Sequence, residues 1–590
     1  MMTPFQFIQK WKRNTVKESG SSQEHFVDLC RLLDQPTPNE ADPDGEWFTF
    51  QKLVNKDTGS KGFADVWRRK RFGWEYKGKW KSLEVAYSQL CQYRESLGNP
   101  PLLIVCDMAR FQIHTNFTGT AKEVHEFDLD GLADPKNIAK LQAAFDDPKQ
   151  LEPGRTQKQV TEEVADKFAA LAGGLRRRGL PAERVAHFLV KAVFCMFAED
   201  IGLLPENVFL DTLREAKGDS GELVAMLTDL FSKMDKGGRY GRHKILRFNG
   251  GLFRDQDVPP LTRTEIAQLV EAAECDWSAI EPSIIGTLFQ RGLDPDKRSQ
   301  IGAFYTSKED IETLLRPVLV APLRKEWEAV RVKAEALWPQ VQETAREKAL
   351  ATRQKEDRKL KDRSRVARGR FDDTIKEFLN RLSAATVLDP ACGSGNFLYV
   401  ALQLLLELEK EVITYARQRG AGSYIPIVDP TQLHGIEANK FAQELAQAVI
   451  WIGYLQWMRQ NGFIEPAIPV LSPLDSIEHR DSVLDLSDPA NPKEPDWPDA
   501  EFIVGNPPFL GDKKMRAELG DEYVNALRKL YAGRLPGQSD LVCYWFEKTR
   551  AKIESGPAKR AGLIATQGIR GGANRTCLDR IKKLCQNLVN

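Results

Sequence analysis

The sequence lacks the features that would place it in several large classes of protein. Its 84 Lys and Arg residues balance 83 Asp and Glu residues, so the formal net charge is only +1. That balance excludes a histone-like basic protein, and binding of nucleic acid would have to come from local basic patches. No apolar run approaches the ~20 residues that cross a bilayer, and the first residues lack the apolar core of a secretory signal. We therefore expect a cytoplasmic protein with no membrane partner.

Cysteine is also used sparsely. The nine cysteines are scattered along the chain, and no two of them form a Cys-x-x-Cys pair. This pattern indicates neither a disulfide framework nor a zinc cluster, and it is typical of a reducing compartment. The 590 residues are sufficient for about three or four domains at roughly 150 residues each.

Apolar spacing predicts three regions. Residues 1–155 combine short strands with one helix at 82–97, and the strands are expected at 63–67, 73–77 and 102–106. Residues 156–295 show the spacing of helices almost throughout, and we interpret them as a helical connector. Within it, helices are expected at 160–175, 182–200 and 206–217.

The third predicted region, residues 296–590, alternates strands with helices, which is typical of a mostly parallel, doubly wound α/β sheet. The predicted fold class of the whole chain is therefore α/β. A charged helical arm, residues 325–382, precedes the sheet, and residues 346–370 carry eleven Lys or Arg against four Asp or Glu. The arm is either a solvated surface or a phosphate-binding one. Strands of the sheet are expected at 384–388, 432–437, 502–504 and 561–565.

A glycine turn follows the first of these strands. Residues 386–397 predict a strand, a tight turn with Gly393 and Gly395, and then a helix from Phe397. Glycine has no Cβ, so a ligand can lie against the backbone there, and such turns sit at the ligand-binding edge of doubly wound sheets. The next strand ends in Glu437, which can accept hydrogen bonds from both hydroxyls of a ribose. The pattern favours a cofactor that contains a nucleoside.

The segment Asn506-Pro507-Pro508-Phe509 follows a later strand. The two prolines stiffen the loop, because proline has a fixed φ and restricts the residue before it. The Asn506 side-chain oxygen and the Pro507 carbonyl can accept hydrogen bonds from one amino group, while Phe509 offers a flat face for stacking. Two acceptors stabilise the positive charge that builds on such a nitrogen during attack. The loop therefore predicts a site for the exocyclic amine of a nucleobase.

Together these motifs resemble the S-adenosyl-L-methionine-dependent DNA adenine N6-methyltransferases of the γ arrangement. The resemblance covers residues 301–567, and it implies that the target base is flipped out of double-stranded DNA. It assigns Asn506 to Phe509 as the catalytic tetrapeptide. A further acidic residue of the family falls at Asp481 or Asp475, and we prefer Asp481. The resemblance implies that the cofactor is bound by Tyr305, Thr306, Asp389, Ala391, Gly393, Gly395, Asn396, Phe397, Glu437 and Asp481.

The N-terminal region carries a second constellation. Asp65 and Glu75 are expected at adjacent strand ends, where two carboxylates can hold Mg²⁺. Lys77, two residues after Glu75, lies on the same strand face and can orient the attacking water or stabilise a pentavalent phosphate. The basic residues around this group suit a phosphate backbone, and the alternative is a solvated strand-and-turn surface. They are Arg68, Arg69, Lys70, Arg71, Lys79 and Lys81.

This arrangement, with Gln89 and Tyr93 on the following helix, resembles the PD-(D/E)xK nuclease fold. A nuclease, a helical connector and a γ-type methyltransferase on one chain resemble the MmeI-type (type IIL) restriction–modification family, and residues 283–290 resemble its connector. The resemblance implies phage defence through methylation of adenine and Mg²⁺-dependent endonuclease activity. It also implies a final hairpin and a target-recognition domain beyond residue 590, supplied by a longer chain or a partner. Residues 1–590 alone are expected to bind the cofactor weakly or not at all and to methylate no specific site.

Three other functions stay open. The chain could be a phage-defence methyltransferase whose N-terminal domain only grips DNA. It could be an inactive fragment that binds DNA or a partner chain. Methylation of RNA or protein through the Asn506 loop is a further alternative, and a nuclease of DNA type on the same chain argues against it.

Overall fold

Two compact units divide the protein. The N-terminal unit contains Met1–Val160 together with two short later segments, Glu411–Ile425 and Trp457–Glu465, and the second unit contains the remaining residues. The boundaries of the three predicted regions stay a prediction. The computed structural model describes residues 2–13, 18–55, 61–79, 81–117, 120–154, 156–248, 252–277, 280–282, 306–350, 354–419, 424–463 and 474–589.

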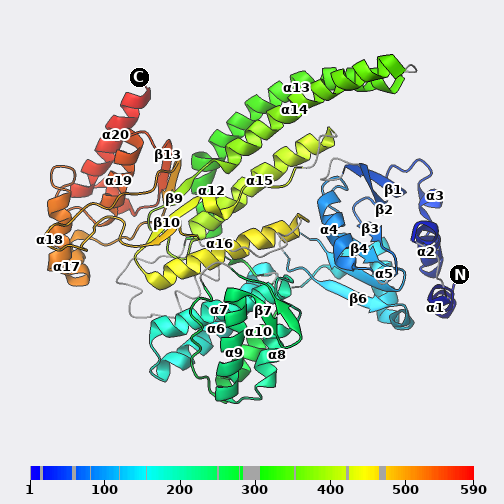
Figure 1. The fold of residues 1–590 in the computed structure, drawn as a ribbon, viewed down its shortest axis with the longest axis horizontal. Coiled ribbons are helices and arrows are strands. Elements are labelled where there is room, and N and C mark those ends of the chain that lie inside the picture. Colours follow the sequence, from blue (N-terminus) through cyan, green and yellow to red (C-terminus); the bar gives the residue numbers. More distant parts are fainter. Residues whose placement is uncertain are drawn as a thin grey trace. The chain divides into compact units, whose positions relative to one another are not determined.

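A mixed six-stranded sheet organises the N-terminal unit (Figure 1). Its strands lie in sequence order, and neighbours are antiparallel except for β3 and β4, which are parallel. A parallel pair needs a crossover connection, and helix α4 (Leu83–Tyr93) lies in that connection. The strands are β1 (Phe48–Asn55), β2 (Lys61–Arg68), β3 (Phe72–Tyr76), β4 (Leu102–Cys106), β5 (Arg110–Thr115) and β6 (Val124–Asp128).

The sheet separates two apolar cores, which is why strand β4 is buried at every position. Side chains alternate along a strand, so Ile104 belongs to one core and its neighbour Leu103 to the other. Helix α4 covers the second core through Leu90. The opposite face carries the first core, to which helices α1 (Pro4–Arg13), α2 (Glu18–Leu32) and α5 (Pro135–Asp146) contribute aromatic residues. Residues that point away from the first core therefore face α4.

The second unit opens with helices, which are α6 (Gln157–Arg177), α7 (Ala182–Asp200), α8 (Val208–Glu215), α9 (Ser220–Lys236) and α10 (Arg263–Ala273). Of these, α6, α7 and α8 correspond to the three that the sequence predicts. A small hairpin of β7 (Gly238–Tyr240) and β8 (His243–Ile245) follows α9. Within the described part of the chain, no helix is both long and apolar enough to span a bilayer. The eight cysteines whose side chains the structure describes form no disulfide.

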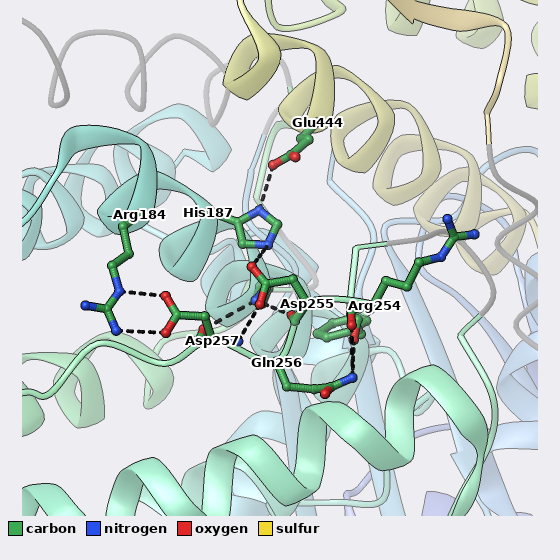
Figure 2. A network of polar contacts seen from close by, with 9 residues as sticks. Arg184, His187, Arg254, Asp255, Gln256, Asp257 and Glu444 are labelled. Atoms are coloured by element: carbon green, nitrogen blue, oxygen red, sulfur yellow. Dashed lines mark hydrogen bonds and ion pairs between the residues drawn. The ribbon is translucent and has the colours of Figure 1, made fainter.

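Helix α7 is joined to helix α16 (Lys440–Gln460) by a polar network (Figure 2). His187 of α7 lies between two carboxylates: its Nδ1 is 2.7 Å from Oε2 of Glu444, and its Nε2 is 3.3 Å from Oδ2 of Asp255. Arg184, one turn earlier, makes two hydrogen bonds to Asp257 at 2.6 and 2.7 Å. The connector is therefore anchored by directional contacts to helix α16.

The predicted arm is a pair of long antiparallel helices, α13 (Ala321–Leu350) and α14 (Gln354–Ser383), seen side by side in Figure 1. Aromatic residues pack at the interface between the two helices, where Trp327 contacts Phe378 and Trp338 contacts Phe371. Near its base, Arg381 makes two hydrogen bonds to Glu326. Helix α12 (Lys308–Leu315) and a π-helical turn, η4 (Arg316–Val320), precede the arm.

A five-stranded sheet in the order β11-β10-β9-β12-β13 forms the core of the rest of the unit, and its paired strands are parallel. The α/β fold class and the doubly wound sheet are thereby confirmed. The strands are β9 (Val387–Asp389), β10 (Leu433–Glu437), β11 (Ile477–His479), β12 (Phe502–Gly505) and β13 (Arg560–Leu563). The helices are α15 (Asn396–Gln418), α16, α17 (Asp512–Leu519), α18 (Asp521–Leu530), α19 (Val542–Glu554) and α20 (Arg575–Val589).

Candidate active sites

The strand order creates a switch point between β9 and β12. Successive strands run from β9 outwards through β10 to β11, and the chain then returns to the other side of β9 with β12. Open α/β sheets bind ligands at the carboxyl ends of the strands at such a point. The predicted glycine turn follows β9, and the loop Asn506 to Phe509 follows β12. The structure thus brings the two strongest sequence motifs to one sheet edge.

Gly505, the last residue of β12, shows how closely these two segments approach. A Cβ atom on this residue would lie 2.4 Å from Oδ1 of Asp389, and its φ is 154°. A larger residue would therefore displace Asp389 from the end of β9. Gly505 was not among the predicted site residues, although a glycine at the end of an apolar strand, directly before Asn506, was a usable signal.

Two carboxylates organise the glycine turn. Asp389 accepts a hydrogen bond at Oδ1 from the Ala391 N–H (3.0 Å), and Glu437 accepts one at Oε2 from the Gly393 N–H (2.9 Å). The second oxygen of Glu437 accepts the Asn439 N–H at 2.8 Å. Glu437 thereby ties the end of β10 to the turn after β9. A carboxylate has about four lone-pair positions, so Glu437 keeps acceptor capacity beyond its backbone contacts.

The remaining residues of the turn are held by packing. Gly393 and Gly395 have φ values of 54° and 82°, which lie in the left-handed region that favours glycine. Trp545 of α19, another residue that the sequence did not reveal, donates its indole N–H to the Pro390 carbonyl at 3.0 Å. Phe397, in the first turn of α15, is buried. The helix therefore starts directly at the turn, with its first N–H groups near the switch point.

Three oxygen atoms at this sheet edge are buried and accept no hydrogen bond from any residue that the structure describes. They are Oδ2 of Asp389, Oδ1 of Asn396 and Oδ1 of Asn506. The Asn506 amide N–H₂ is occupied, because it donates to Oγ1 of Thr306 at 2.8 Å. Buried polar atoms are normally paired, and each unpaired one costs about 1–3 kcal/mol. Three such acceptors on adjoining loops fit a ligand that carries several N–H or O–H donors.

The other predicted site residues differ in where they lie relative to the switch point. Asp481 follows β11 at the carboxyl edge, whereas the alternative, Asp475, precedes β11. Asp481 accepts two backbone N–H groups of its own loop and the hydroxyl of Tyr523 at 2.7 Å. Within the tetrapeptide, Pro507 is buried, and Pro508 and Phe509 are half-buried. Tyr305 and residues 283–290 lie outside the described residues.

Burial shifts the acid–base properties of the two carboxyls. It raises the pKa of Asp389 from 3.8 to about 8, and the nearby Glu437 carboxyl adds to this shift. Burial also raises the pKa of Glu437, while hydrogen bonds from Asn439 and Gly393 oppose the rise. A cationic ligand beside these groups would favour their ionised forms. The site is therefore suited electrostatically to a ligand with positive charge.

The raised pKa of Asp389 predicts a pH-dependent stability. The unfolded carboxyl ionises near pH 4, whereas the folded one holds its proton up to about pH 8. The unfolded state thus binds fewer protons in this window, and the contribution to stability, on the order of a few kcal/mol, is lost as pH rises through it. We expect the unfolding midpoint of Asp389→Asn to fall less between pH 5 and pH 8 than that of the unmodified protein. Thermal unfolding checks this, with Asp499→Asn at an exposed carboxyl as control; parallel pH profiles for Asp389→Asn and the unmodified protein would contradict it.

The second candidate site lies in the N-terminal unit, where Asp65, Glu75, Lys77 and Gln89 come together. Asp65 accepts the Tyr76 N–H at Oδ2 (2.7 Å), which places its carboxylate at the end of β3 beside Glu75. Lys77 donates to Oε1 of Glu75 at 3.0 Å and to Oε1 of Gln89 at 2.9 Å. Glu75 is buried on the sheet face covered by α4, and Lys77 is only partly exposed.

The donor set of this site fits a magnesium ion. Mg²⁺ prefers oxygen ligands and is usually held by one or two carboxylates together with water and substrate phosphate, and Asp65 and Glu75 supply two carboxylates. Among the described residues, no group of three or more His, Cys, Asp or Glu side chains forms a complete protein cage for a metal. An ion here would keep open positions for water or phosphate.

The basic residues around this site differ in their roles. The Arg68 guanidinium lies over three aromatic rings, 5.1 Å from Phe48 and 5.7 Å from both Trp47 and Phe145. Burial lowers its pKa, so Arg68 is a packing residue as much as a charged one. The remaining predicted basic residues are exposed or half-exposed, namely Arg69, Lys70, Arg71, Lys79 and Lys81.

Comparison with known families accounts for most of the chain. Residues 2–178 match the N-terminal domain of MmeI, residues 183–253 match its helicase spacer domain, and residues 359–584 match its DNA-methyltransferase domain. The three matches occur in the order that the sequence predicts. The chain belongs to the MmeI-type restriction–modification family.

The individual relatives are distant in sequence. DNA methyltransferase A of Bacillus subtilis is 24% identical over 433 residues, which are 69% of this chain and 43% of the relative. A putative type II restriction enzyme and methyltransferase of Methanocaldococcus jannaschii is 23% identical over 309 residues, 45% of this chain and 24% of the relative. The solved structure of the type IIL enzyme MmeI in complex with DNA shares the fold, with a TM-score of 0.54 and 24% identity over 72% of this chain and 53% of that one. The chain thus spans less than half the length of the curated relatives it matches.

Proposed function

We propose that this protein transfers the methyl group of S-adenosyl-L-methionine to the N6 amino group of adenine in double-stranded DNA. One observation carries the proposal: three buried acceptors, on Asp389, Asn396 and Asn506, receive no hydrogen bond from the described residues and lie at the switch point of the sheet. The proposed cofactor and the adenine amine both bring N–H donors to this edge. The match of residues 359–584 to the DNA-methyltransferase domain supports the same chemistry.

The residues of the turn have distinct proposed roles toward the cofactor. Glu437 accepts the two ribose hydroxyls with the lone pairs that its backbone contacts leave free. The buried carboxyl of Asp389 has one oxygen that receives no hydrogen bond from the described residues, and it faces a cationic part of the cofactor. That positive charge favours the ionised form of the carboxyl. The bound cofactor supplies an electrophilic methyl group on a sulfonium sulfur. The turn between Asp389 and Gly395 holds that cofactor in one orientation beside the loop after β12.

The loop from Asn506 to Phe509 acts on the target base. Oδ1 of Asn506 accepts one hydrogen of the adenine amine, and Thr306 fixes the side chain by accepting its N–H. The Pro507 carbonyl accepts the second hydrogen, and Phe509 stacks on the flipped base. These two hydrogen bonds favour a tetrahedral nitrogen, whose lone pair is no longer delocalised into the ring. They also stabilise the positive charge that develops on the nitrogen during attack. One amine proton leaves to solvent after the methyl group is transferred.

Transfer of a labelled methyl group tests this proposal directly. Purified protein is incubated with labelled S-adenosyl-L-methionine and, separately, with DNA of mixed sequence, RNA and protein. We expect label in DNA and, after digestion to nucleosides, in N6-methyl-2′-deoxyadenosine. Label in N4-methylcytosine would overturn the adenine assignment, and label confined to RNA or protein would overturn the DNA assignment.

We infer a second activity, Mg²⁺-dependent cleavage of DNA, for the N-terminal unit. The contacts of Lys77 with Glu75 and Gln89, next to Asp65, support it. Asp65 and Glu75 would hold the ion, which supplies Lewis-acid stabilisation of the phosphate, and Lys77 would orient the attacking water. An N-terminal domain that only grips DNA is the alternative outcome. It predicts DNA binding that does not change with Mg²⁺ and no cleavage.

The helical arm is a proposed contact for the DNA backbone. Arg363 and Arg365 of α14 are exposed at 62% and 83% of their side chains, and each has one acidic neighbour, at 3.3 and 3.5 Å. Because each phosphate contact adds about 0.9 to the salt slope of binding, we expect Arg363→Gln/Arg365→Gln to lower that slope by about 1.8. Fluorescence titration at several salt concentrations measures it, with Arg214→Gln on the connector as control. A slope equal to that of the control would indicate a solvated arm.

A further inference from the structure

Helix α4 determines one side of the proposed nuclease site. It carries Gln89, whose side-chain oxygen accepts a hydrogen bond from Lys77 at 2.9 Å. The Lys77 ammonium is therefore held between a carboxylate on β3, Glu75, and an amide on α4. A shift of α4 by even 1 Å would break this arrangement, since hydrogen bonds of this kind weaken steeply with distance and angle.

The outer side of α4 is held by segments that are distant in sequence but belong to the same N-terminal unit. Arg459, in the last turn of α16, pairs with Glu84 of α4 at 2.8 Å. Gln92 of α4 donates its side-chain N–H to the carbonyl of Gly462. Arg417, in the last turn of α15, donates to the carbonyl of Gln92 at 3.3 Å. Both ends of α4 are thus fixed by the ends of two helices of the matched methyltransferase domain.

Gly462 is the point of closest approach. It ends helix α16 in a left-handed conformation (φ 69°), and the Phe463 N–H closes the cap on the Met458 carbonyl at 3.0 Å. A Cβ atom on Gly462 would lie 2.4 Å from the backbone carbonyl oxygen of Ser88. Ser88 directly precedes Gln89, so any side chain at position 462 would press on the turn of α4 that carries the Lys77 partner.

We propose that Gly462 and Arg459 are positioning residues for DNA cleavage, acting on Lys77 through helix α4 and Gln89. The inference rests on the proposed nuclease activity and deepens it. Neither residue contacts Asp65, Glu75 or Lys77 in the contacts that the structure describes. The contacts described above connect both residues to α4, so we expect methyl transfer not to depend on them.

The test compares two substitutions in the full chain. Gly462→Ala is expected to lower the kcat of Mg²⁺-dependent DNA cleavage at least about 10-fold, with the KM for DNA and the rate of methyl transfer unchanged. Arg459→Glu places a carboxylate opposite that of Glu84, and it is expected to lower cleavage several-fold. The exchange Glu84→Arg/Arg459→Glu restores the ion pair and is expected to restore cleavage. Rescue by the exchange is a result that a general loss of stability would not give.

The matched control is Gly179→Ala, at a glycine of similar φ (84°) that follows helix α6 and has no other atom within 4 Å of the added Cβ position. Hydrogen exchange over residues 83–93 gives a readout that needs no activity, and faster exchange is expected in Gly462→Ala than in Gly179→Ala. Cleavage and exchange equal to the control would overturn the inference. Absence of cleavage by the unmodified protein would count against the proposed nuclease, and hydrogen exchange would then decide the placement of α4 alone.

Discussion

Asn506→Ala is expected to reduce methyl transfer to DNA by about 10²–10³-fold, the usual cost of removing one group that stabilises charge in a transition state. The substitution removes the buried Oδ1 acceptor and leaves the Thr306 hydroxyl without its partner. Binding of the cofactor is expected to stay within a few-fold of the unmodified protein, because the turn from Asp389 to Gly395 is unchanged. Labelled methyl transfer and isothermal titration with S-adenosyl-L-methionine measure the two effects separately.

The matched control for this experiment is Asn491→Ala, which removes an exposed asparagine from the same unit, where it bonds only locally to Asp488. It is expected to leave both readouts unchanged. Equal loss of cofactor binding and methyl transfer in Asn506→Ala would mean that the residue supports the fold of the site. Full retention of methyl transfer would show that Asn506 does not receive the amine.

Much of the sheet that carries this loop was predictable from sequence. Strands β9, β10, β12 and β13 are short apolar runs that end in turn residues, and helices separate them. Strand β11 (Ile477–His479) escaped prediction because three residues are too few to show periodicity. The strand order, and with it the meeting of Asp389 with Gly505, results from long-range packing that no local pattern encodes.

The contacts within the two candidate sites also include some that local sequence predicts and others that depend on long-range packing. The short spacing from Asp65 to Lys77 predicted a cluster, because adjacent strands and side-chain alternation are local properties. The support of α4 by Arg459 and Gly462 joins residues more than 300 positions apart, and periodicity cannot indicate such a pair. The unpaired oxygens of Asp389, Asn396 and Asn506 likewise emerge only once every neighbour has its place.

Asp65→Ala and Lys77→Ala are each expected to reduce Mg²⁺-dependent DNA cleavage by about 10³-fold, while methyl transfer continues at its normal rate. A bound metal ion contributes several kcal/mol of charge stabilisation, and each 1.36 kcal/mol corresponds to a factor of ten in rate. Asp65→Ala removes the carboxylate that accepts the Tyr76 N–H and leaves Glu75 as the remaining carboxylate of the site. Lys77→Ala removes the cation that lies between Glu75 and Gln89. Conversion of supercoiled plasmid to nicked and linear forms, with and without Mg²⁺, measures the effect.

Lys136→Ala provides the control, because Lys136 is an exposed cation of helix α5, on the opposite face of the sheet from α4. Cleavage that persists in Asp65→Ala and Lys77→Ala would mean that the activity lies elsewhere or belongs to a contaminant. The two substitutions are also expected to differ with metal concentration. Raised Mg²⁺ should partly restore Asp65→Ala, whose defect is weaker metal binding, but it should not restore Lys77→Ala, since no metal ligand is missing there. That contrast separates the role proposed for Asp65, holding the metal, from the role proposed for Lys77, orienting the attacking water.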